Sequence, residues 1–467
     1  MSSGKTSYFA LFLIIILYVT AAPFPSNGPA RKIQMLQYRV KYLTRELLKC
    51  QEEDKLDLHL RSFQNRQITC NDGTTAGYYI KRSYESNKWI IYLEGGWYCF
   101  NDASCTQRMN VPDRKSLTSS RDWLSKRRGF GILSPIAMEN PTWYNANHVL
   151  IPYCSSDAWS GNVSRQESGG KFSFMGYRII NEVIKELLPQ GLLEAKHLLL
   201  AGSSVGGIGV IMSIDRVAQM LSAAGSSCKV RGISDSGWYL EKIPDLKKCK
   251  NDPRSCNKPS QAIRKGMRYW NGVVPSACRE EFKTEPWRCY FGHNVYRTLR
   301  SPLFIFQWQY DLTQVIVNNP TTHHEQSFGQ ELIRKLMMLA SDMKTSMRNN
   351  RLNAVFLPAC MAHSTLTNSD WLSVKVKGYT LNRAINCWIS KDDLKNTTPS
   401  PNLASAHCKS ALIDDCSQPL CNSLCPAPRN PFTGELLATP TNSTITPSPS
   451  LGLAGMQNDQ NPRQNNG

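Results

Sequence analysis

KHLLLAGSSVGGIGVIMSIDRVA, residues 196–218, combines a short apolar run, a G-x-S-x-G turn and a helix-like segment. This order predicts a β-strand, a sharp turn and an α-helix, as in a nucleophile elbow. Ser204 stands at the tip of the turn, between Gly202 and Gly206. A strand and a helix can pass this closely only where the flanking residues lack a side chain. Ser204 is therefore the candidate nucleophile.

Short apolar runs alternate with longer amphipathic segments along the rest of the chain. This pattern predicts an α/β fold with a mainly parallel central sheet flanked by helices. In such sheets the chemistry gathers at the carboxyl ends of the strands. The expected strands span residues 89–93, 148–152, 197–200, 230–233, 303–308 and 354–357.

The two ends of the chain predict segments outside this domain, which we place at residues 61–434. Residues 1–22 contain a lysine, then an apolar run and then small residues, which is the order found in a secretory signal peptide. The apolar run is shorter than the ~20 residues of a membrane span, so we expect no transmembrane segment. Residues 23–60 are predicted to form a basic, partly helical arm. Residues 435–467, rich in Thr, Pro, Ser, Asn and Gln, are predicted to be a disordered tail.

The cysteines and glycosylation sequons indicate a secreted, extracellular protein. The chain has 16 cysteines, an even number that allows every one to be paired. The C-terminal group lacks the paired C-x-x-C spacing of zinc sites, so we expect disulfides and no metal. This group is Cys408, Cys416, Cys421 and Cys425. N-glycosylation is expected at Asn162, Asn396 and Asn442, which begin the sequons.

The formal net charge of +19 at pH 7 favours polyanionic partners. For an exported protein the abundant polyanion is sulfated glycosaminoglycan, so we expect no nucleic-acid partner. The basic residues cluster at 126–128, 247–250 and 264–268.

A serine nucleophile needs a base and an orienting acid, which α/β-hydrolases order as Ser, acid, His. His363 follows the expected strand 354–357 and is favoured as the base. Asp311 and Asp235 both follow expected strands and both obey the order. Asp311 is favoured by the longer apolar run before it, and Asp235 remains its rival. The other downstream histidines are His293, His323, His324 and His407.

The oxyanion hole of such a site takes one N–H from the residue after the serine, which is Val205. A second donor comes from a glycine-rich loop after an earlier strand. The sequence Gly95-Gly96-Trp97-Tyr98 follows the expected strand 89–93 and supplies this loop.

Five motifs together resemble the Notum family of secreted carboxylesterases, which is related to the pectin acetylesterases. They are LEGGWYCF at 93–100, IPYCSSDAWSG at 151–161, the Ser204 turn, DSGW at 235–238 and YWNGVVP at 269–275. The resemblance runs from about residue 70 to about residue 434. It implies an α/β-hydrolase fold and removal, without a cofactor, of the palmitoleoyl group from a serine of Wnt proteins, which inhibits Wnt signalling.

The resemblance also implies a role for individual residues. The triad falls on Ser204, Asp311 and His363, which decides between the two acids, and the oxyanion donors fall on Gly96, Trp97 and Val205. An association with heparan sulfate or glypicans is implied as well. The acyl pocket carries over to Trp97, Tyr98, Tyr239, Pro259, Ile263, Tyr290, Phe291 and Val317.

Two alternatives stay open on the sequence. A polysaccharide acetylesterase would share the fold and the triad, and the volume of the acyl pocket separates it from a lipid esterase. A non-catalytic glycosaminoglycan-binding protein on a hydrolase scaffold is the other alternative.

Overall fold

The computed structural model of this chain divides into Met1–Asp57 and Leu58–Gly467. Nearly all of the residues that it describes belong to the second unit. They are residues 56–241, 259–318, 330–349, 354–368, 371–394, 409–416, 418–431 and 435–437. The predicted signal peptide and most of the predicted arm and tail lie outside these ranges.

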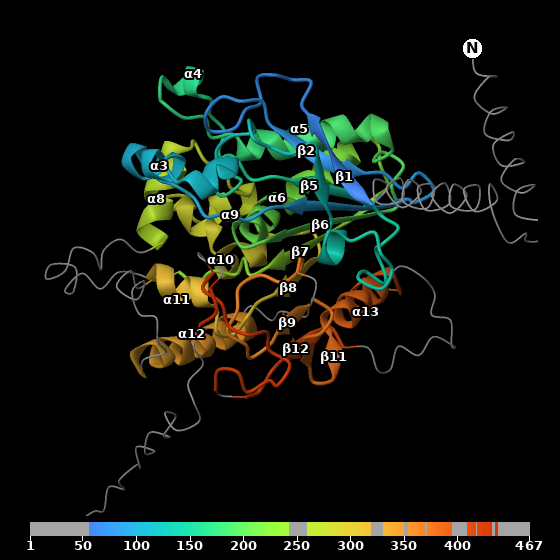
Figure 1. The fold of residues 1–467 in the computed structure, drawn as a ribbon, viewed down its shortest axis with the longest axis vertical. Coiled ribbons are helices and arrows are strands. Elements are labelled where there is room, and N and C mark those ends of the chain that lie inside the picture. The colour runs from blue at the N-terminus through green and yellow to red at the C-terminus, as the bar shows by residue number, and fades with distance from the viewer. Residues whose placement is uncertain are drawn as a thin grey trace, which may run out of the picture. The chain divides into compact units, whose positions relative to one another are not determined.

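One sheet of ten strands forms the centre of the described chain (Figure 1). Its order is β12-β9-β8-β7-β6-β3-β5-β2-β1-β4. Neighbours from β12 through β5 run parallel, while β2 is antiparallel to both β5 and β1. The strands are β1 (Asp57–Ser62), β2 (Gly77–Lys81), β3 (Lys88–Leu93), β4 (Lys126–Arg128), β5 (Asn147–Ile151), β6 (His197–Ser203), β7 (Lys229–Asp235), β8 (Leu303–Phe306), β9 (Val355–Leu357) and β12 (Ala411–Ile413). The predicted mainly parallel sheet is confirmed, and each of the six expected strands is present.

Helices cover both faces of this sheet. Along β3, Ile91 and Leu93 join the core cluster that contains α5 (Gly176–Leu187) and α6 (Val205–Ala223), whereas Ile90 and Tyr92 join the cluster that contains α13 (Leu381–Leu394). This alternation is the period of two of a strand, and both sets are apolar because both faces are buried. The helices are α3 (Asp102–Met109), α4 (Arg165–Ser168), α5 (Gly176–Leu187), α6 (Val205–Ala223), α8 (Pro259–Tyr269), α9 (Ser276–Glu281), α10 (Gly292–Val295), α11 (Leu312–Asn318), α12 (Gln330–Asn349) and α13 (Leu381–Leu394), the last preceded by the hairpin β10 (Lys375–Val376) and β11 (Tyr379–Thr380).

Described strands and bridges also lie just outside residues 61–434. β1 begins at Asp57 and pairs with β2, so a boundary at residue 61 would cut through a strand. At the other end Leu436 bridges to Arg429. Among the described residues, no helix is both long and apolar enough to cross a membrane.

Disulfides staple the insertions of the fold, as expected. Cys416, Cys421 and Cys425 of the C-terminal group are all bonded, and Cys408 lies outside the described residues. The even number of cysteines allows every one to be paired, but Cys228 carries a free thiol. The described pairs are Cys70–Cys154, Cys99–Cys105, Cys278–Cys289, Cys360–Cys425 and Cys416–Cys421.

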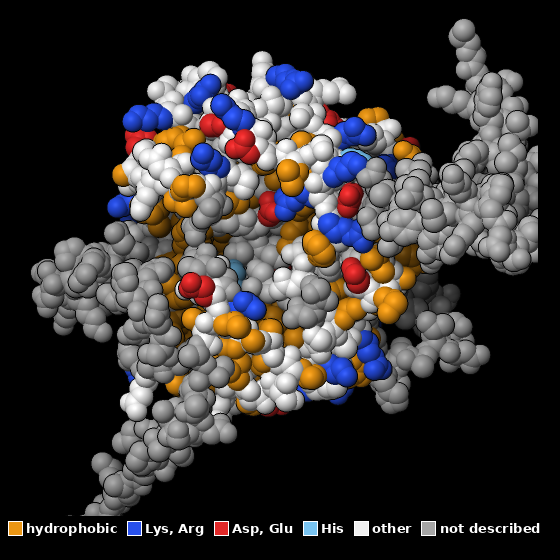
Figure 2. All heavy atoms as spheres, viewed as in Figure 1, with side chains coloured by type: hydrophobic (Ala, Val, Ile, Leu, Met, Phe, Trp, Pro, Cys, Tyr) orange, Lys and Arg blue, Asp and Glu red, His pale blue; other side chains and the backbone are white. Residues whose placement is uncertain are grey.

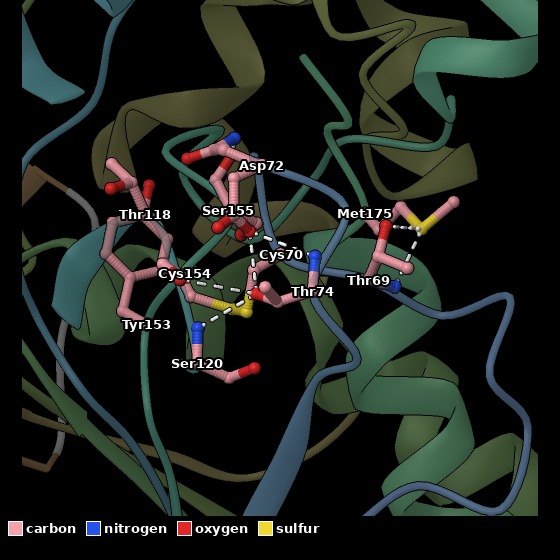
Figure 3. Close-up of a disulfide and its surroundings, with 12 residues drawn as sticks. Thr69, Cys70, Asp72, Thr74, Thr118, Ser120, Tyr153, Cys154, Ser155 and Met175 are labelled. Atoms are coloured by element: carbon pink, nitrogen blue, oxygen red, sulfur yellow. Dashed lines mark hydrogen bonds between the residues drawn. A yellow bond between two sulfur atoms is a disulfide. The ribbon is translucent and has the colours of Figure 1, made fainter. Parts of the chain in front are cut away.

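One of these disulfides fixes the loop that follows β5 (Figure 3). It joins Cys154 of that loop to Cys70, which precedes β2. Beside it, the Asn71 amide donates to the main-chain oxygen of Ser155 at 2.8 Å, and the Asn71 N–H donates to that of Cys154 at 2.9 Å. The loop after β5 is therefore held at its start, which is important because it supports the site described next.

Candidate active site

The predicted strand, turn and helix around Ser204 are present. β6 ends at Ser203, α6 begins at Val205, and Ser204 between them has φ 58° and ψ −124°. A Cβ atom on Gly202 would lie 2.5 Å from the Gly206 carbonyl oxygen, so the turn requires glycine here. A positive φ at a serine is the strained conformation that lifts the side chain out of a nucleophile elbow.

The Ser204 hydroxyl lies at one end of a chain of hydrogen bonds that includes the predicted base and acid. Its Oγ is 2.8 Å from Nε2 of His363, which follows β9. The other ring nitrogen, Nδ1, is 3.0 and 3.1 Å from the two carboxylate oxygens of Asp311, which follows β8. All three residues follow the carboxyl ends of parallel strands of one sheet, in which β8 and β9 are neighbours and β7 separates β8 from β6. The structure thus brings Ser204, Asp311 and His363 together.

The surroundings of His363 favour its protonated form. Burial lowers the pKa of its imidazole, but the Asp311 carboxylate, and to a smaller extent Asp235, raise it more, so that the pKa lies above 6.5. Asp311 is fully buried and is itself held by Gln307, whose amide donates to Oδ2 at 2.8 Å. The site can therefore stabilise an imidazolium without letting the acid move.

Asp235, the rival acid, takes a different place. Its carboxylate accepts hydrogen bonds from the hydroxyls of Ser203 and Ser236 and from the N–H groups of Thr365 and Leu366. It makes no direct hydrogen bond to His363 within the described residues.

The predicted oxyanion loop lies against the Ser204 turn. A Cβ atom on Gly95 would be 3.0 Å from that of Ser204. Arg108 Nη2 donates to the Gly96 carbonyl oxygen at 2.6 Å, and Trp97 has a φ of 61°. Among the described residues, no hydrogen bond uses the N–H groups of the three predicted donors, Gly96, Trp97 and Val205.

The loop after β5 braces this oxyanion loop. Ser156 accepts a hydrogen bond from Arg108 Nε at 2.8 Å on its hydroxyl, and one from the Cys99 N–H at 3.1 Å on its carbonyl. The indole N–H of Trp159 donates to the Glu94 carbonyl oxygen at 3.1 Å. The loop after β5 and Arg108 of α3 thus hold the Gly95-Gly96-Trp97 backbone in place.

Most of the predicted acyl-pocket residues line one apolar pocket. The exception is Val317 of α11, which is half-buried and does not line it. Ile208, one turn of α6 beyond Ser204, is a wall that the sequence prediction missed. Its signal was present, because a residue four positions along a helix lies on the same face. The lining is Trp97, Tyr98, Ile208, Tyr239, Pro259, Ile263, Tyr290 and Phe291.

This pocket is almost closed. Its volume is about 10 Å³, which is room for about one water molecule. The cause is aromatic packing, since Trp97 stacks on Tyr98 at 4.5 Å between ring centroids, and Tyr98 meets Trp270 edge-on at 5.6 Å. The hydroxyl of Tyr239 is buried in the wall. Burial and the Asp311 carboxylate raise the pKa of this phenol, and the neighbouring Ser204 side chain lowers it.

A larger cleft of about 470 Å³ lies on the other side of Trp97 and contains Ser204 and His363. The face drawn in Figure 2 is hollowed near its centre. Arg127 lies in the wall of the cleft and pairs with Glu94 at 2.7 Å. The basic cluster at 126–128 is the strand β4 and borders this cleft. The cluster at 264–268 lies on α8, and the one at 247–250 falls outside the described residues.

The predicted glycosylation sites are only partly covered by the structure. Asn162 is half-buried, and its Oδ1 accepts a hydrogen bond from Arg178 at 2.7 Å. Asn396 and Asn442 lie outside the described residues. His323, His324 and His407 do so too, and His293 lies beside Glu241 at 3.8 Å.

Comparison with known proteins shows the family to which this chain belongs. A family model described as pectinacetylesterase matches residues 49–426, which include every residue of the site described above. The chain belongs to the pectinacetylesterase family. It is 44% identical to the human palmitoleoyl-protein carboxylesterase NOTUM over 89% of this chain and 83% of that protein.

Two further relatives lie in the same group. The chain is 41% identical to the palmitoleoyl-protein carboxylesterase notum2 of Xenopus laevis, over 83% of this chain and 78% of that protein. It is 37% identical to the palmitoleoyl-protein carboxylesterase NOTUM of Drosophila melanogaster, over 83% of this chain and 57% of that protein. The resemblance to Notum is therefore confirmed, and it extends over most of the chain.

Proposed function

We propose that this chain is a serine carboxylesterase that removes the palmitoleoyl group from a serine of Wnt proteins and so inhibits Wnt signalling. The observation that carries the proposal is the hydrogen-bonded series Ser204, His363 and Asp311 at the carboxyl ends of β6, β9 and β8. The relatives named palmitoleoyl-protein carboxylesterases support the choice of substrate.

The geometry supports a two-step acyl transfer. Ser204 Oγ attacks the ester carbonyl carbon while its proton passes to Nε2 of His363, and Asp311 holds the proton on Nδ1. His363 then donates its new proton to the departing serine oxygen of the substrate. A water molecule, deprotonated by the same nitrogen, hydrolyses the acyl-enzyme.

The charge that develops on the ester oxygen needs fixed donors. The N–H groups of Gly96, Trp97 and Val205 are available because nothing among the described residues occupies them. Losing one such donor typically costs about 10²–10³ in rate. We assign the oxyanion hole to these three groups.

A long acyl chain requires the pocket to open. A cavity of about 10 Å³ holds none of its methylenes, so binding must part the stack of Trp97 on Tyr98. Burial of a dozen methylenes at about 0.8 kcal/mol each is on the order of 10 kcal/mol, an upper bound that exceeds the cost of separating one aromatic pair. We propose that the acyl chain itself displaces Trp97.

The closed pocket also favours a second candidate, a polysaccharide acetylesterase. An acetyl group has almost nothing to bury and would not need the pocket to open. The pectinacetylesterase family match is consistent with this alternative. It predicts the opposite order of activity on short and long esters.

Hydrolysis of p-nitrophenyl acetate and octanoate by the purified protein separates the two candidates. The lipid esterase predicts a higher kcat/KM on octanoate, lost in Ser204→Ala. A higher value on acetate would favour the acetylesterase. No Ser204-dependent hydrolysis of either ester would contradict both and support the non-catalytic scaffold.

We further propose that residues 1–22 direct secretion of this protein and that Asn162, Asn396 and Asn442 carry N-glycans. Heparan sulfate or a glypican is the proposed partner of the basic clusters. Size-exclusion of the secreted protein with and without glycosidase tests the glycans, and salt elution from heparin resin tests the basic clusters.

A further inference from the structure

The carboxyl end of β7 contacts both the Ser204 turn and the segment after His363. Here Asp235 and Ser236 follow each other in the sequence. The Asp235 carbonyl oxygen accepts the Ser204 N–H at 2.8 Å, and the Ser236 N–H donates to the carbonyl oxygen of Phe306 in β8 at 2.9 Å. The main chain of this pair is therefore fixed between the nucleophile turn and the next strand.

Three consecutive N–H groups after His363 donate hydrogen bonds to the side chains of Asp235 and Ser236. The Ser364 N–H donates to Ser236 Oγ at 3.0 Å. The Thr365 and Leu366 N–H groups both donate to Asp235 Oδ2, at 2.8 and 2.9 Å. Successive N–H groups that converge in this way form a binding site for an anion, and here the anion is a side chain of the protein itself.

The Asp235 carboxylate is fully buried and fully partnered. Besides the two N–H groups, it accepts hydrogen bonds from the hydroxyls of Ser203 and Ser236. Tyr92 of β3 in turn donates to Ser203 Oγ at 2.6 Å. Burial raises the pKa of this carboxyl, whereas the four hydrogen bonds that it accepts lower the pKa and favour the ionised form. In that form Asp235 places a buried negative charge between the Ser204 turn and the segment after His363.

We propose that Asp235 is a second, positioning carboxylate of this site, which holds the His363 segment against the Ser204 turn and stabilises the imidazolium that forms during acyl transfer. This inference rests on the proposed esterase function. Asp311 orients the ring through Nδ1, whereas Asp235 acts through the backbone of the three residues that follow His363 and through its charge.

Several charged or titratable groups besides Asp235 lie near His363 and can affect the pKa of its imidazole. Asp311, before α11, is in direct contact with the ring, and Asp235 is the other carboxylate that raises the imidazole pKa. The remaining titratable groups that line the cleft with His363 are Tyr92 of β3, Glu94 after β3, and Arg127 and Arg128 of β4.

Asp235→Asn removes the charge and keeps the shape. Its amide oxygen can accept the two N–H groups, and its NH₂ can donate to Ser236 Oγ, which is also an acceptor. Ser236→Ala keeps the charge but removes the anchor of Ser364. Asp215→Asn is the matched control, because it makes the same chemical change on α6, at a carboxylate that accepts the N–H of Ser301 at 2.8 Å.

The readout is the rate at which a fluorophosphonate labels Ser204 between pH 5 and pH 9, followed by intact mass. Labelling needs neutral His363 and no ester substrate, so it distinguishes this inference from the proposed function, which ester turnover tests. We expect Asp235→Asn to move the midpoint of the pH profile to lower pH. We expect Ser236→Ala to label about tenfold more slowly at an unchanged midpoint, and Asp215→Asn to match the wild type.

A midpoint for Asp235→Asn equal to that of the wild type would overturn the charge role. A wild-type labelling rate in Ser236→Ala would overturn the positioning role, and this variant decides the matter if Asp235→Asn does not fold. In ester hydrolysis the same variants should lower kcat and leave KM unchanged, because neither residue lines the acyl pocket.

Discussion

Replacing Asp311 by asparagine should abolish most turnover while leaving the fold intact. The two oxygens of Asp311 are not equivalent. Oδ2 accepts the amide of Gln307 at 2.8 Å, and the Oε1 of Gln307 is held by the Trp238 N–H at 3.1 Å. Gln307 can therefore only donate towards residue 311. Oδ1 accepts a longer hydrogen bond, from the Gln314 N–H at 3.2 Å. We therefore expect the amide introduced by Asp311→Asn to place its oxygen at the Oδ2 position, where Gln307 donates at 2.8 Å, and its NH₂ at the Oδ1 position.

At the Oδ1 position the new NH₂ faces Nδ1 of His363, 3.0 Å away. Because an NH₂ group can only donate, Nδ1 must lose its proton, and the neutral imidazole carries its proton on Nε2 instead. That nitrogen faces Ser204 Oγ at 2.8 Å and can no longer accept the serine proton. A wrong tautomer of this kind costs about 10⁴-fold in kcat, or about 5.5 kcal/mol in the barrier.

The assay is the hydrolysis of p-nitrophenyl octanoate, with kcat and KM measured for the wild type, Asp311→Asn and Asp215→Asn. Thermal unfolding of the same samples reports on the fold. We expect Asp215→Asn to behave as the wild type and Asp311→Asn to lose kcat at a near-normal Tm. If Asp311→Asn kept more than about one tenth of the wild-type kcat, the tautomer argument would be refuted.

Three further predictions concern the base, the pocket and the β5 loop. Since Asp311 and Asp235 raise the pKa of His363, kcat/KM should fall with decreasing pH through a midpoint above 6.5, and a midpoint below that value would contradict this. Tyr239→Phe removes a buried hydroxyl that lies beside the Ser204 side chain and makes this wall of the pocket wholly apolar; it should lower the KM for octanoate, whereas an unchanged or higher KM would count against it. Replacing Cys70 and Cys154 together by serine opens a bridge between residues 84 apart and should cost about 2–5 kcal/mol, so an unchanged Tm would show that this disulfide does not stabilise the fold.

The strands that the sequence predicted are those buried on both faces. β3 and β5 to β9 show as continuous apolar runs because helices cover the sheet on either side. β1, β2, β4 and β12 of the same sheet were missed. β4 reads Lys-Arg-Arg at an edge of the sheet, and its strand character comes from pairing with a neighbour and not from its composition. Long-range pairing of this kind has no local signal.

The residues of the candidate site also differ in how far the local sequence predicts them. Ser204 was predictable because the turn that exposes it is encoded by adjacent residues. Position could not separate Asp311 from Asp235, because both end neighbouring parallel strands at the same edge of the sheet. The two are distinguished only by the contact of the His363 side chain, whose Nδ1 is hydrogen-bonded to Asp311. The near-closure of the acyl pocket was equally hidden, since it depends on rings from segments as far apart as Trp97 and Tyr290.

Incubation of a serine-palmitoleoylated Wnt peptide with the purified protein and with Ser204→Ala, followed by mass spectrometry of the peptide, tests the proposed deacylation on its own substrate. We expect loss of the mass of the palmitoleoyl group with the wild type and an unchanged peptide with Ser204→Ala. An unchanged peptide with the wild type, or equal removal by both proteins, would contradict it.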